Sequence, residues 1–170
     1  QENLENALEK VITTREDDKY YSLDYRTKKA NNENCDYFIS IHLNSASNTS
    51  AKGCEVWLYD ENSKLQTLAN NLCNNLATIM NTPNRGVKYS KKLAVLKNTK
   101  MPDLLIEIDF ISNKEVENYL RNDKNLKNIS DTISNCSFIL SLTFISLSAC
   151  FLNISMILKS KSTIHSSGNS

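Results

Sequence analysis

The chain has 170 residues, of which 40% are hydrophobic and 23% are charged, and this is enough for one domain with a buried core. The 20 Lys and Arg residues nearly balance the 19 Asp and Glu residues, which excludes a nucleic-acid binder that works through a basic surface. With only 3 Gly and 2 Pro, the composition also excludes collagen-like architectures and Pro/Gly linkers.

The first part of the chain predicts helices and strands in alternation. Residues 2–10 space their apolar side chains as a short helix does, and the β-branched residues 11–14 predict a strand. After a polar loop, residues 23–32 predict a second helix. Residues 37–43 (YFISIHL) predict a strand that is buried on both faces, as in the middle of a parallel or mixed sheet.

The middle of the chain continues this alternation. Residues 54–59 predict a strand, and residues 62–80 form the clearest amphipathic helix of the chain. Residues 81–92 contain a Pro and a Gly and predict a loop, which a short strand at residues 93–96 follows.

Residues 104–110 (LLIEIDF) predict another buried strand, and Asn113 precedes an acidic first turn as the cap of a helix at residues 114–122. Helices that alternate with strands in this way predict an α/β fold. We expect three layers, in which helices flank a twisted, mixed and mostly parallel sheet.

The C-terminal part of the chain allows three interpretations. Residues 1–130 form the predicted domain, and residues 131–170 form an apolar segment with a Ser-rich tail. Residues 137–158 are long enough to span a bilayer, and the two lysines behind them would place the domain outside the cell. Alternatively, residues 129–142 form a helix that packs on the sheet. The third interpretation is that this C-terminal segment results from translation past a frameshift.

Five widely spaced cysteines form no CxxC pair, so the sequence supports neither a zinc ribbon nor a redox motif. We expect free and mostly buried thiols. A cysteine nucleophile would need a neighbouring base, and of the two histidines only His42 could serve.

Two predicted strands carry ionisable side chains near their carboxyl ends, where ligands bind in open α/β sheets: His42 and Glu107. Apolar neighbours flank Glu107, so its burial is costly unless the carboxyl is paired or protonated. Glu107 is therefore a candidate general acid or base with a raised pKa. On the residues alone, Glu107 could also reach solvent at the strand tip, and His42 could be a core histidine.

Several segments occur in one order at matching intervals: ITTREDD, LDYRTKKAN, DYFISIHLNS, GCEVWLY, NRGVK, LAVLKNTKMPDLLIEIDFISN and KEVENYL. Together they resemble the zinc-dependent N-acetylmuramoyl-L-alanine amidases of the Amidase_3 type, over about residues 8–125. The resemblance implies an autolysin, sporulation hydrolase or phage endolysin. Such an enzyme cleaves the amide between N-acetylmuramic acid and L-alanine of the peptidoglycan stem peptide. It implies action outside the cell or in the cell wall, although no signal peptide is visible after Gln1.

The resemblance also implies a mechanism. Two His and one Glu hold a Zn²⁺ ion, which leaves one position open for water. His42, in SIHLN, matches the second His ligand. Glu107, in LLIEIDF, matches the catalytic Glu that takes a proton from the water and passes it to the leaving amine.

The other His and Glu ligands of the family normally lie upstream of the segment that matches ITTR, where only 11 residues precede Ile12. We therefore expect both ligands to be missing from this chain, which is either a fragment of an active enzyme or a defective copy. The alternative function is that of a catalytically inactive remnant that binds the cell wall or is tethered to a membrane.

Other positions in the matching segments bear on this mechanism, and all of them except Asp109 have two interpretations each. Asp109 stands where the family usually has Gly, and its charge is expected to raise the pKa of Glu107. Glu55 matches a family-typical Glu and lies either near the site or in a salt bridge at a strand end. Arg85 and Gly86 either shape a substrate loop or serve a backbone turn. Trp57 either stacks on a sugar or packs in the core.

Overall fold

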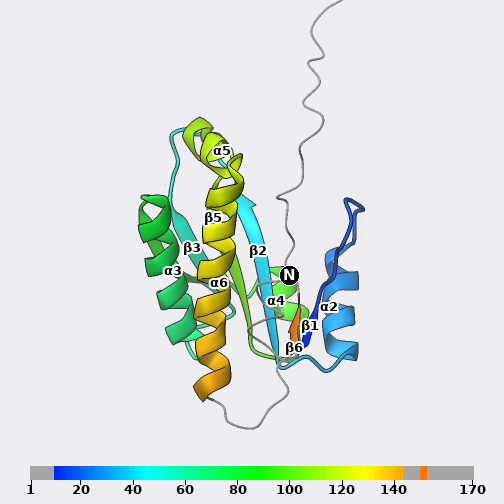
Figure 1. The fold of residues 1–170 in the computed structure, drawn as a ribbon. Coiled ribbons are helices and arrows are strands. Elements are labelled where there is room, and N and C mark those ends of the chain that lie inside the picture. The colour runs from blue at the N-terminus through cyan, green and yellow to red at the C-terminus, as the bar shows by residue number, and fades with distance from the viewer. Residues whose placement is uncertain (1–9, 144–149, 153–170) are drawn as a thin grey trace, which may run out of the picture.

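The computed structural model describes residues 10–143 and 150–152. These residues form a six-stranded sheet with the strand order β1-β6-β2-β5-β3-β4. Neighbouring strands run parallel, except β3 and β5, which run antiparallel. Helices cover both faces of the sheet (Figure 1). The three-layer α/β fold with a mixed, mostly parallel sheet is therefore confirmed.

Several predicted helices and strands agree closely with the structure. Helix α2 has the predicted bounds, and α3 begins four residues later than predicted, at Gln66. The strands are β1 (Lys10–Ile12), β2 (Tyr37–Asn44), β3 (Cys54–Leu58), β4 (Asn84–Tyr89), β5 (Asp103–Phe110) and β6 (Cys150–Leu152). The helices are α2 (Leu23–Asn32), α3 (Gln66–Met80), α4 (Ala94–Asn98), α5 (Lys114–Leu120) and α6 (Asp123–Thr143).

Two predictions of secondary structure are wrong. Residues 84–89 form strand β4 rather than a loop, because pairing with β3 orders a sequence that has no buried face of its own. Residues 94–98 form helix α4, where a short strand was predicted at 93–96. Periodicity cannot distinguish a strand from one helical turn in so short an apolar run.

One face of the sheet packs against α3, α5 and α6. Ile39 and Ile41 of β2 lie in this core with apolar residues of the three helices. Helix α6 begins at Asp123 and contributes Ile129 and Ile133 to the core, which agrees with a C-terminal helix that packs on the domain. The four described cysteines are free and buried, as expected: Cys35, Cys54, Cys73 and Cys136.

The suggested membrane span is not supported by the described residues. Within 10–143 and 150–152, no helix combines the length and apolar character that crossing a bilayer requires. The remaining residues of the suggested span, 144–149 and 153–158, lie outside the described residues. The helix predicted at residues 2–10 lies outside them as well, apart from Lys10, which begins β1.

Helices α2 and α4 cover the opposite face of the sheet. Phe38 of β2 and Leu105 of β5 pack there against Ala30 of α2 and Val95 of α4. Because side chains alternate between the faces of a strand, His42 shares this face with Phe38, and Glu107 shares it with Leu105. The candidate site residues therefore lie on the face that α2 and α4 cover in part.

Candidate active site

Strand pairing brings three predicted polar residues into one row. In the parallel pair of β2 and β5, His42 lies directly opposite Glu107. In the antiparallel pair of β5 and β3, Glu107 lies directly opposite Glu55. Directly opposed residues share a face, and their Cβ atoms lie about 5 Å apart. His42, Glu107 and Glu55 therefore form what we call the polar row, which crosses three neighbouring strands.

His42 is held in a half-buried position by its own strand. Its Nε2 atom lies 2.7 Å from the hydroxyl of Ser40, two residues earlier on the same face of β2. Burial, together with the nearby charge of Arg26, lowers the pKa of His42 below its usual value. The imidazole is therefore neutral at pH 7, the form in which it can accept a hydrogen bond or bind a metal ion.

Glu107 is the member of the polar row for which the described residues supply no hydrogen-bond partner. Its Oε2 atom is buried and has no hydrogen bond within the part of the chain that the structure describes. Burial, and then the charge of Glu55, raise the pKa of Glu107 to about 7. A carboxyl with this pKa can both accept and release a proton at neutral pH, as a general acid–base catalyst must.

Asp109 does not have the predicted effect on Glu107. The charge that contributes to the raised pKa of Glu107 belongs to Glu55. Asp109 is fully buried, and its carboxylate accepts hydrogen bonds from the backbone N–H of Gly53 at 2.8 Å and from the hydroxyl of Thr82 at 2.6 Å. Its role in this fold is to join β5 to the segments that precede β3 and β4.

Glu55 forms an ion-pair cluster beside Glu107. Its Oε2 atom accepts hydrogen bonds from Arg85 Nε at 2.9 Å and from Lys88 Nζ, and its Oε1 atom accepts from Trp57 Nε1 at 3.0 Å and Asn44 Nδ2 at 3.2 Å. Burial acts to raise the pKa of Glu55, but the hydrogen bonds outweigh it and the pKa is lowered. Both interpretations of Glu55 are met, because it lies next to the site and also forms salt bridges.

A glycine makes room for the guanidinium of this cluster. Gly53 has a φ of +122°, and a Cβ atom added there would lie 2.6 Å from Cγ of Arg85 and 2.7 Å from the backbone O of Pro83. Only glycine adopts this conformation without strain, so Gly53 allows Arg85 to cross the start of β3. Gly53, Ser40 and Lys88 were not among the predicted site residues. Two-residue alternation along β2 could have identified Ser40.

The donor atoms of the described residues do not complete the zinc site that the family resemblance implies. A catalytic zinc ion takes three protein ligands. Within the described ranges, no group of three His, Cys, Asp or Glu residues could hold a metal ion. Of the donors that such a site needs, His42 contributes one imidazole.

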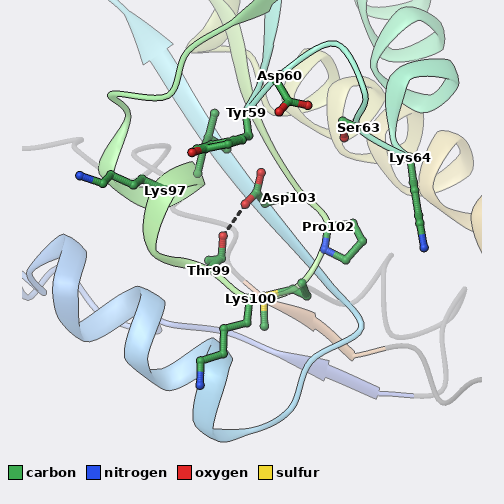
Figure 2. Close-up of a pocket in the computed structure, with 11 residues that line it drawn as sticks. Tyr59, Asp60, Ser63, Lys64, Lys97, Thr99, Lys100, Pro102 and Asp103 are labelled. Atoms are coloured by element: carbon green, nitrogen blue, oxygen red, sulfur yellow. Dashed lines mark hydrogen bonds between the residues drawn. The ribbon is translucent and has the colours of Figure 1, made fainter.

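A separate cavity of about 370 Å³ lies near the start of β5 (Figure 2). The carboxylate of Asp103 lies in it, hydrogen-bonded to the hydroxyl of Thr99. Asp103 precedes Glu107 by four residues, so the two carboxylates are about 13 Å apart along the strand. The amino groups of Lys64, Lys97 and Lys100 extend away from one another in Figure 2 and converge on no common point.

Asp103→Asn is expected to remove a pH dependence of stability. Burial raises the pKa of Asp103 to about 6, from an ordinary value of 3.8, although the Thr99 hydrogen bond opposes this rise. Between pH 4 and 6 the folded protein keeps a proton that the unfolded chain releases, so the stability of the wild type falls as the pH rises. The fall should be at most about 3 kcal/mol.

Urea unfolding at pH 4, 5 and 6 measures this effect. The slope of stability against pH should be less negative in the variant than in the wild type. Identical slopes in the two proteins would contradict the raised pKa of Asp103.

The fold and the polar row define a class of α/β proteins in which a histidine and a carboxyl group lie together on one face of a mixed sheet. Residues 1–136 match the family Amidase_3, described as N-acetylmuramoyl-L-alanine amidase. The chain therefore belongs to this family.

Two proteins of Bacillus subtilis are similar to the chain. LytC, an N-acetylmuramoyl-L-alanine amidase of Bacillus subtilis, is 36% identical over 114 residues, which cover 65% of this chain and 22% of LytC. The uncharacterised protein YqiI of the same organism is 32% identical over 126 residues, which cover 73% of this chain and 60% of YqiI. The chain thus spans less than two thirds of either relative.

A solved structure agrees with this family membership. The N-acetylmuramoyl-L-alanine amidase from Clostridium difficile 630 has a TM-score of 0.74 and 28% sequence identity to this chain. The match covers 85% of this chain and 81% of that chain. The fold described above is thus that of the amidase domain.

Proposed function

We propose that this chain acts on peptidoglycan and hydrolyses the amide between N-acetylmuramic acid and L-alanine of the stem peptide. Membership of the amidase family supports this reaction. The observation that carries the proposal is the pairing of His42 with Glu107, whose buried carboxyl oxygen has no partner among the described residues.

In this reaction Glu107 is the general base. Its carboxylate takes a proton from the attacking water and later passes that proton to the amine of L-alanine as the amide bond breaks. His42, which is neutral, lies beside it and has a lone pair for a substrate group, for water or for the zinc ion that this family generally uses. That His42 binds zinc in this chain stays a prediction, since the described residues hold no second and third ligand.

The substrate determines where the protein acts. Peptidoglycan lies outside the cytoplasmic membrane, so we propose that the protein works outside the cell or in the cell wall. Related proteins include an endolysin of Bacillus phage SPP1 and a sporulation-specific N-acetylmuramoyl-L-alanine amidase of Bacillus subtilis, whose names agree with action on the cell wall.

The test is to identify the bond that is cut. The purified chain is incubated with purified peptidoglycan, with and without added Zn²⁺, and the soluble products are analysed by mass spectrometry and N-terminal labelling. We expect released peptides that begin with a free L-alanine amine and glycan strands that remain intact. If no new L-alanine terminus forms in either condition, the proposed activity is wrong for this chain.

The zinc content of the same sample provides a second measurement. About one equivalent of zinc per chain after dialysis would show that ligands outside the described residues complete the site with His42. A His42→Ala variant should then lose most of this zinc, because a site with one ligand fewer binds the metal more weakly. Zinc that remains fully bound in the variant would contradict the role of His42.

A further inference from the structure

We propose that Arg85 and Lys88 form a carboxylate-binding subsite beside the polar row, which receives an acidic side group of the peptide whose amide lies at His42 and Glu107. This inference rests on the proposed function, and it adds which chemical group of the substrate the face recognises. The subsite would favour stem peptides with free carboxylates over the same peptides with amidated carboxylates.

The charges in the cluster of Glu55, Arg85 and Lys88 do not balance. Glu55 is the only carboxylate among the described residues that forms a salt bridge with either cation, so two positive charges share one negative charge. Glu55 is 3% exposed, whereas the side chains of Arg85 and Lys88 are 39% and 33% exposed. The cluster therefore presents a net positive charge to solvent while its carboxylate is buried.

Within the described residues, both cations have hydrogen-bond donors that no protein group uses. A guanidinium has five N–H groups, and those of Arg85 bond within the described residues only to Glu55 through Nε and to the backbone O of Lys52 through Nη1. The ammonium of Lys88 has three N–H groups and bonds only to Glu55 among the same residues. A ligand carboxylate could accept hydrogen bonds from both side chains without displacing Glu55.

Aromatic rings hold the two cations in place. The guanidinium carbon of Arg85 lies 5.0 Å from the ring centre of Phe110, and Lys88 Nζ lies 5.3 Å from the ring centre of Trp57. Contacts of this kind stabilise a cation over the ring. Side chains that are already ordered lose little entropy when a ligand binds, so the subsite is preorganised.

The position of the subsite suits a peptide whose amide lies at Glu107. Strand β4 lies two strands away from β5, on the far side of β3, so the backbones of Arg85 and Lys88 lie about 10 Å from the backbone of Glu107. An extended peptide advances about 3.5 Å per residue. A peptide that runs across the strands from the amide at Glu107 would bring a carboxylate to Arg85 and Lys88 two or three residues from that amide.

The test compares two ligands that differ only in charge. The whole chain is titrated with the product peptide L-alanyl-D-glutamate, which lacks the scissile amide, and with the same peptide after amidation of both glutamate carboxylates. Affinity is measured by calorimetry. The fluorescence of Trp57, the single tryptophan of the chain, reports binding at the cluster because its indole bonds to Glu55 at 3.0 Å. We expect the free acid to bind about tenfold more tightly.

Three variants locate the origin of this preference. Arg85→Gln and Lys88→Gln should each reduce the preference while affinity for the amidated ligand stays within about twofold. Arg85→Lys should retain part of the preference, because it keeps the charge and loses the planar fork. Lys91→Gln is the matched control, since Lys91 is 67% exposed and pairs with Asp60 rather than with Glu55. It should keep the full preference.

The outcomes separate the subsite from the proposed function. Equal affinity of the wild type for both ligands would overturn the subsite and leave the amidase proposal standing. A preference that survives in both Arg85→Gln and Lys88→Gln, each shown by circular dichroism to be folded, would overturn it as well. If neither ligand binds, both the subsite and the peptide-binding function of this face are wrong.

Discussion

Glu107→Gln is expected to abolish amide hydrolysis and at the same time to stabilise the fold. Glutamine cannot accept the proton of the attacking water, and loss of a general base lowers the rate by about 10²–10⁴-fold. The carboxyl it replaces is half-buried and has an oxygen with no partner among the described residues, next to the charged Glu55. An uncharged amide removes the cost of ionising this group in the folded protein.

The sign of the stability effect follows from the raised pKa of Glu107, which is about 7 against an ordinary value of 4.5. Above pH 7 both the folded and the unfolded wild type are ionised, and the folded state bears the full cost of the buried charge. Below pH 4.5 the carboxyl is protonated in both states. We therefore expect the variant to gain about 1–3 kcal/mol at pH 8, and this gain should disappear by pH 4.

Two measurements on the same protein preparation check this prediction. Peptide release from peptidoglycan reports activity, and urea unfolding at pH 4 and pH 8 reports stability. Glu61→Gln is the matched control, because Glu61 is exposed and both quantities should stay at the wild-type value. A Glu107→Gln variant with normal activity would exclude Glu107 as the base, and a variant less stable at pH 8 than the wild type would contradict the cost of its charge.

Glu55→Gln is expected to destabilise the protein, by about 2 kcal/mol. The substitution removes the negative charge between Arg85 and Lys88 and leaves two like charges around a buried amide. Removal of one partner of a fully buried ion pair costs about 3–5 kcal/mol, and the cost is smaller here because both cations are partly exposed. Added salt screens the remaining repulsion, so part of the loss should be recovered at 1 M NaCl.

Chemical unfolding at low and high salt measures this loss. Asp24→Asn provides the control, because it removes an exposed ion pair with Lys28 and should cost about 0.5 kcal/mol or less. The pKa of Glu107 should also fall in Glu55→Gln, since the neighbouring charge that helps to raise it is gone. Equal stability losses in the two variants would show that the cluster contributes no more than a surface salt bridge.

The site residues were predictable because they interrupt apolar runs. His42 and Glu107 lie in segments that are otherwise hydrophobic, and a polar residue in a buried strand is costly unless it has a function or a partner. The edge strand β4 was not predictable in this way. Its residues are exposed or half-buried, and they become a strand only through their pairing with β3.

The sequence alone determined the class of fold, the central strands β2 and β5, helix α2, and the two ionisable residues near the ends of those strands. These are local properties, because burial on both faces and helical spacing leave a periodic pattern in nearby residues. Tertiary structure decided that His42 opposes Glu107 and that Glu107 opposes Glu55. It also decided that Glu55, rather than Asp109, acts on Glu107 and gathers Arg85 and Lys88. Strand register joins residues that are distant in the chain, so no local pattern contains it.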